Sequence, residues 1–101
     1  MKFEISHEDV IAKVTNEIDA CRSFQANIEN HLAALRNVEE DDQAIGIAKS
    51  IAYNNRMIQL YLERAAAMLK MIGLYDSERD ELTINNFRAK LAIIKTAGIM
   101  L

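Results

Sequence analysis

MIQLYLERAAAMLKMIGLY, residues 57–75, is the stretch that decides the fold of this chain. Fourteen of its nineteen residues are apolar, and the five others leave no wide polar face: Gln59, Glu63, Arg64, Lys70 and Gly73. A helix that is apolar on nearly all sides has to be covered from more than one direction. We therefore expect this stretch to be the central helix of a helical assembly.

Apolar residues recur at alternating steps of three and four on both sides of an acidic run, Glu39–Asp42. The first seam comprises Ile11, Val14, Ile18, Cys21, Gln25, Ile28, Leu32 and Leu35. The second comprises Ala48, Ile51, Asn55, Ile58, Leu62, Ala65, Leu69 and Ile72. This spacing is typical of coiled-coil helices. It predicts a long antiparallel hairpin, about 7–38 and about 44–72, in which Ile18 lies opposite Ala65 and Cys21 opposite Leu62.

Two amides interrupt these seams. Gln25 and Asn55 fall in adjacent layers when the hairpin is folded, so we expect a polar pair in the core. A buried amide without a partner costs about 1–3 kcal/mol, which mutual pairing avoids. The alternative is that one or both residues point outward or bond to the backbone.

Capping signals mark the predicted ends. Ser6 and Asp9 suggest a capping box before the first helix, and Asp41 or Asp42 an N-cap for the second. Gly73 is the expected C′ residue, and Thr83 an N-cap for a third helix. That third helix, about 84–97, carries the apolar row Ile84, Phe87, Leu91 and Ile94. The predicted fold class is all-α: one domain, 1–101, forming a coiled-coil-like, oligomeric bundle.

The second helix has another apolar face, away from its seam. We expect the third helix to cover the end near Met68 and Met71, or to cross to another subunit through the polar 76–81 connection. The rest stays uncovered and indicates a contact surface for a partner or for another copy of the chain. We assign this contact surface to Tyr53, Met57, Leu60, Tyr61 and Met68.

Composition narrows the class of protein. The absence of proline, with only three glycines, favours helix, and the formal net charge is −3. Residues 1–50 carry five basic and ten acidic side chains, which argues against non-specific nucleic-acid binding. Cys21 is the single cysteine, and neither a signal-peptide pattern nor a membrane-length apolar run is visible. We expect a cytoplasmic protein that binds neither nucleic acid nor membrane.

Catalytic and cofactor motifs are not apparent in the sequence. Glu4 and His7 have the Glu-x-x-His spacing of di-iron bundles, but those sites use the motif twice. We predict no enzyme, no metal and no cofactor, and expect a partner-binding protein (regulator, inhibitor or adaptor) that acts as a homo-oligomer. The alternative is an oligomer that sequesters an anionic or nucleotide-like small molecule between subunits. Its pocket would use Tyr53, Asn54, Arg56, Tyr61 and Arg64. A structural subunit of a larger assembly is a third reading.

Overall fold

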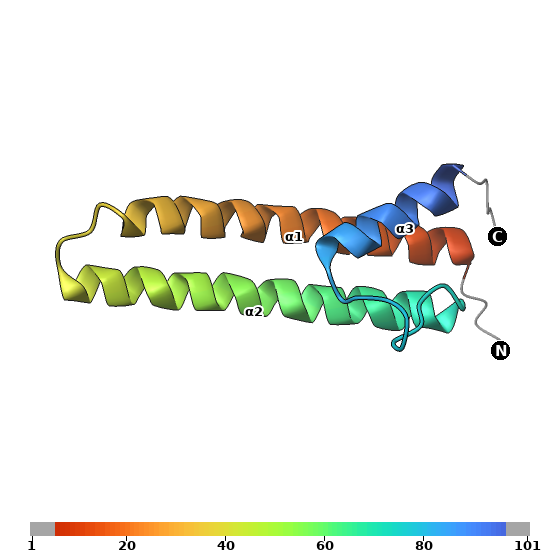
Figure 1. Ribbon diagram of the computed structural model, residues 1–101. Helices are drawn as coiled ribbons and strands as arrows, with labels where there is room; N and C mark the ends of the chain where they lie inside the picture. Colours follow the sequence, from red (N-terminus) through yellow and green to blue (C-terminus); the bar gives the residue numbers. More distant parts are fainter. Residues whose placement is uncertain (1–5, 97–101) are drawn as a thin grey trace.

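The computed structural model describes residues 6–96, which form three helices and no strand. Helix α1 spans His7–Leu35, α2 spans Asp41–Met71 and α3 spans Ile84–Thr96. Figure 1 shows α1 and α2 side by side as a long antiparallel hairpin, with α3 crossing the half of α1 near its N-terminus. The molecule is elongated, with extents of 57 × 32 × 24 Å. The all-helical hairpin with a short third helix is confirmed.

Both ends of the connection between α1 and α2 differ from the prediction. Helix α1 ends at Leu35 rather than near Val38, and α2 begins at Asp41, three residues before Ala44. Glu40 is the N-cap, and Asp41 and Asp42 lie in the first turn, where the positive end of the helix dipole favours acidic groups. At α1, Ser6 is the N-cap, but its side chain makes no capping hydrogen bond, so the predicted capping box is wrong.

The other two predicted helix ends are confirmed. Gly73 has a φ of 74°, and α2 closes in a Schellman motif. In this motif the N–H groups of Leu74 and Gly73 donate to the carbonyls of Leu69 and Lys70, at 2.8 and 3.1 Å. At the start of α3, the N–H of Asn86 donates to Thr83 Oγ1 at 3.1 Å.

The core lies in the half of the hairpin that α3 covers. It comprises Val10, Val14, Ile18, Cys21, Leu62, Ala65, Leu69, Ile84 and Phe87. Phe87 anchors α3: it is fully buried, and its ring stacks on Tyr75 with centroids 5.6 Å apart. The other half of the hairpin, toward the 36–40 connection, is two helices thick, and Leu32 stays 45% exposed there.

Helix α3 packs on α1 and the seam rather than on the far face of α2. The predicted cover of Met71 is wrong, since this side chain remains 64% exposed. The reason is the course of the 72–83 connection. It places Leu82 and Ile84 beside Asn55, Ile58 and Leu62, which lie on the opposite side of α2 from Met71.

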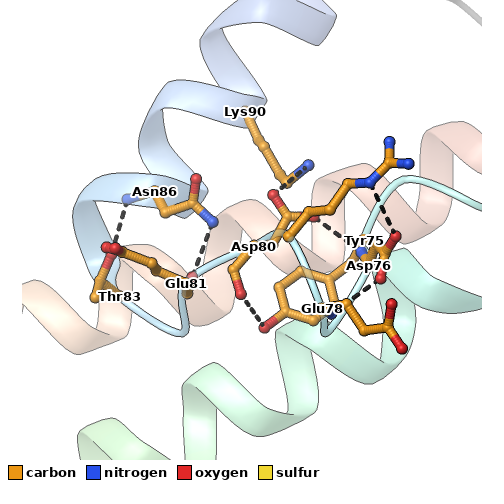
Figure 2. Close-up of polar contacts among 9 residues, drawn as sticks. Tyr75, Asp76, Glu78, Asp80, Glu81, Thr83, Asn86 and Lys90 are labelled. Carbon is orange, nitrogen blue, oxygen red and sulfur yellow. Dashed lines mark hydrogen bonds and ion pairs between the residues drawn. The ribbon is translucent and has the colours of Figure 1, made fainter.

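The connection is ordered by its own polar groups (Figure 2). The N–H of Asp76 donates to Asp80 Oδ2 at 2.8 Å, and Lys90 Nζ lies 3.0 Å from Asp80 Oδ1. The hydrogen bond from the Asp76 N–H has the larger effect and the contact with Lys90 the next, and both lower the pKa of the Asp80 carboxyl. Their contribution to stability is therefore lost as the pH falls through that lowered pKa. Tyr75 Oη also donates to the Asp80 carbonyl at 3.3 Å, a further hydrogen bond between two residues of the connection.

Candidate partner-binding surface

The residues of α2 that face α1 determine which residues face outward. Asn54, Leu62, Ala65 and Leu69 are buried, and the Cys21 thiol donates to the carbonyl of Ile58 at 3.9 Å. Two successive four-residue steps, Asn54–Ile58–Leu62, replace the strict heptad alternation of the prediction. A straight helix with 3.6 residues per turn drifts about 20° per heptad, so a three-four pattern read over four heptads misplaces its far end.

The amide pair of the hairpin is therefore a different one. Gln25 and Asn55 are both exposed, and the predicted burial of this pair is wrong. Both side chains instead border a surface hollow of about 480 Å³ beside the start of α3. The amides that meet are Asn27 and Asn54: Asn27 Nδ2 donates to Asn54 Oδ1 at 3.3 Å, and Asn54 Nδ2 donates to the Ser50 carbonyl at 2.7 Å.

The side of α2 next to its α1-facing row carries a second regular row, which we call the outer stripe. It comprises Gly46, Ser50, Tyr53, Met57, Leu60, Arg64, Ala67 and Met71, at alternating steps of four and three. Tyr53, Leu60 and Met71 are 59, 43 and 64% exposed, although they are large apolar side chains. One helix thus presents a coiled-coil-like row in which the described chain leaves Tyr53, Leu60 and Met71 exposed.

The predicted contact residues divide between the two faces. Tyr53 and Leu60 lie on the exposed part of the outer stripe, and Met57 is half-buried beside them. Tyr61 turns toward α1, where its ring meets Phe24 edge-on at 5.4 Å. Met68 packs against the hydrophobic core. The sequence-based reading did not include Gly46 and Ser50, which continue the same four-three spacing by two further steps.

The five residues suggested for a small-molecule pocket do not gather at one place in a single chain. Asn54 is buried against α1, while Tyr53 and Arg56 are exposed. Surface hollows lie beside the helices of residues 6–96, and four of them, of about 230–480 Å³, have linings that contain none of the five residues.

Arg64 has a structural partner that sequence reasoning missed. Its Nη2 lies 2.7 Å from Glu17 Oε1, and its guanidinium lies over the Tyr61 ring, 5.0 Å from the centroid. Glu17 is 7% exposed, and its Oε2 is buried without a hydrogen-bond partner. A signal existed: Glu17 lies seven residues after Val10 and four before Cys21, within the buried row of α1.

Cys21 is enclosed by the hairpin. Its side chain has no exposed surface, and burial, followed by the charge of Glu17, raises the pKa of the thiol from 9.0 to about 11. Within the described residues, no group of three or more His, Cys, Asp and Glu side chains is placed to hold a metal ion. None of the helices described is long and apolar enough to cross a membrane.

The Cys21 thiol is expected to resist modification until the protein unfolds. A pKa raised from 9.0 to about 11 lowers the thiolate fraction at pH 8 by about 100-fold, and burial slows access further. The test is the rate of reaction with a disulfide reagent in buffer and in concentrated urea. The same shift predicts stability that falls as the pH rises from about 9 toward 11, since only the unfolded thiol ionises there. Equal rates in buffer and urea would contradict the enclosed position of Cys21.

Comparisons of this chain with protein-family models, with curated proteins and with solved structures find no match.

Proposed function

We propose that this chain is a non-enzymatic, partner-binding helical protein (a regulator, inhibitor or adaptor) that acts as a homo-oligomer through the outer stripe of α2. The observation that carries the proposal is the exposure of Tyr53, Leu60 and Met71 along one side of one helix. Contiguous apolar surface of this kind marks interaction sites, and Tyr and Met are enriched at interface cores.

The polar groups of the hairpin support a binding role rather than a chemical one. Glu17 is held by Arg64, Asn54 by Asn27 and Ser50, and Asp80 by Lys90. Each of these contacts joins two helices, orders a connection or satisfies a buried amide. The proposal therefore assigns these contacts to the scaffold and assigns the function to the exposed apolar residues of the stripe, Tyr53, Leu60 and Met71.

Leu60→Glu tests the proposal, because it places a charge at the middle of the outer stripe on a side chain that is already 43% exposed. The unmodified chain is expected to sediment as an oligomer, and the variant as an 11.4 kDa monomer of unchanged helix content. A charge buried in an apolar contact has to be paired or the contact is lost.

Ile93→Glu is the matched control. Ile93 is 63% exposed on α3, outside the stripe, so this variant is expected to keep the mass of the unmodified chain. The proposal fails if the unmodified chain is monomeric, or if Leu60→Glu and Ile93→Glu behave alike.

A further inference from the structure

The order of residues in the outer stripe is self-complementary when a second copy runs antiparallel to the first. Aligning Met57 with Leu60 of the second copy fixes every other layer. Tyr53 then faces Arg64 of the second copy, Ser50 faces Ala67 and Gly46 faces Met71. In these layers an aromatic ring meets an arginine that is already paired with Glu17 of its own chain, two small residues meet, and a long side chain meets a glycine. Every contact between two positions then occurs twice, once in each direction, which is the isologous contact of a two-fold dimer.

We propose that the occupant of the outer stripe is a second copy of this chain, packed antiparallel in this register. The inference rests on the proposed function for its surface and adds the partner, the direction and the register. The stripe from Gly46 to Met71 is about 38 Å long at 1.5 Å per residue, nearly the whole of α2.

Gly46 supports this occupant independently. It lies inside α2, where glycine costs about 0.8–1.0 kcal/mol relative to alanine. A Cβ built at this position meets nothing within 4 Å, so packing within one chain does not require glycine there. In the antiparallel register, glycine at position 46 leaves space for the Met71 side chain of the second copy.

Charges beside the stripe support the antiparallel direction. A flanking row carries Lys49, Arg56, Glu63 and Lys70, each seven residues after the last. In the proposed register Arg56 lies beside Glu63 of the second copy, and the reciprocal pair forms across the two-fold axis. Lys49 lies beside Lys70 of the second copy near each end, a like-charge contact that the solvent there screens.

A parallel arrangement of the same helices is less favourable. Each stripe residue would then face its own copy, so Arg64 would meet Arg64 in the contact and Gly46 would meet Gly46 across a gap. Arg64 has Glu17 of its own chain as a counter-ion, so the contact between the two Arg64 side chains costs little, whereas the gap at Gly46 loses packing. The order of residues in the stripe therefore favours the antiparallel dimer.

Paired cysteine variants test the register. Ser50→Cys and Ala67→Cys are made separately in a Cys21→Ala background, then oxidised alone and as a mixture. Both positions hold small residues, so neither change overfills the contact. The antiparallel register predicts a disulfide-linked pair only in the mixture. Either variant alone places its two cysteines about 26 Å apart along the helix and stays unlinked.

The other outcomes separate this inference from the proposed function. If either cysteine variant alone forms a disulfide-linked dimer, the two copies are parallel. That result overturns the antiparallel register but leaves the outer stripe as the contact surface. A dimer that gives no linkage in the mixture overturns the register. A monomer, for the unmodified chain and the variants alike, overturns both.

Charge exchange gives a second readout that needs no cysteine. Arg56→Glu and Glu63→Arg alone are each expected to weaken dimerisation by about tenfold, because each replaces two ion pairs by two like-charge contacts. The double variant restores both pairs and is expected to return to within about threefold of the unmodified chain. Additive weakening in the double variant overturns the pairing of Arg56 with Glu63.

Discussion

Phe87→Ala is expected to lower the free energy of unfolding by about 3–5 kcal/mol, the usual cost of emptying a fully buried aromatic site. Phe87 has no exposed surface, stacks on Tyr75 and is the largest side chain that α3 places in the core. A 101-residue domain has a total stability of roughly 5–15 kcal/mol, so the variant is expected to lose a large fraction of it. Urea denaturation followed by helix content measures the loss.

Ile93→Ala is the control for this prediction, because Ile93 lies on the same helix but is 63% exposed. It is expected to change stability by less than about 0.5 kcal/mol. A small effect of Phe87→Ala, close to that of the control, would show that α3 does not pack on the hairpin as described.

Arg64→Met is expected to destabilise the fold by about 2–3 kcal/mol, although the Arg64 side chain is 58% exposed. The cost arises at Glu17, whose side chain is 9% exposed and loses its ionic partner Arg64. Among the described residues, the other oxygen of this carboxylate has no hydrogen-bond partner, so loss of the guanidinium leaves both oxygens unpaired. Urea denaturation at one fixed protein concentration measures the effect.

Glu17→Leu combined with Arg64→Met separates this cause from the loss of Arg64 packing. Removing the buried carboxylate is expected to recover most of the stability, because an apolar side chain suits the site between Val14 and Cys21. If the double variant is no more stable than Arg64→Met, the unpaired carboxylate is not the source of the cost.

Much of the fold follows from local sequence signals. The three-four spacing predicts two long helices and their pairing. Gly73 and Thr83 mark helix ends through backbone chemistry that needs no tertiary information. The apolar row of α3 is also the row it buries, at Ile84, Phe87 and Ile94.

The errors share a physical origin in the tertiary arrangement. Asn54 and Asn55 differ by one residue, or about 100° around the helix, and only the actual rotation of α2 against α1 decides which is buried. The face that α3 covers depends on the path of the 72–83 connection, which is fixed by contacts of Tyr75, Asp76 and Asp80 that carry no periodic pattern.

The candidate surface was partly predictable for the same reason. Its apolar character is visible in the sequence, because Tyr53, Met57 and Leu60 stand outside the seam. Which residues belong to the surface cannot be predicted from the sequence, because Tyr61 and Met68 pack inside the chain, against α1 and the core. Once they are set aside, the remaining residues form the regular outer stripe.

The most direct test of dimerisation through the outer stripe is the mass of the unmodified chain, measured by sedimentation velocity from low to high micromolar concentration. We expect a mass that approaches 22.8 kDa, twice the 11.4 kDa of one chain, as the concentration rises. A single species of 11.4 kDa throughout that range would contradict it, because the outer stripe would then remain open to solvent.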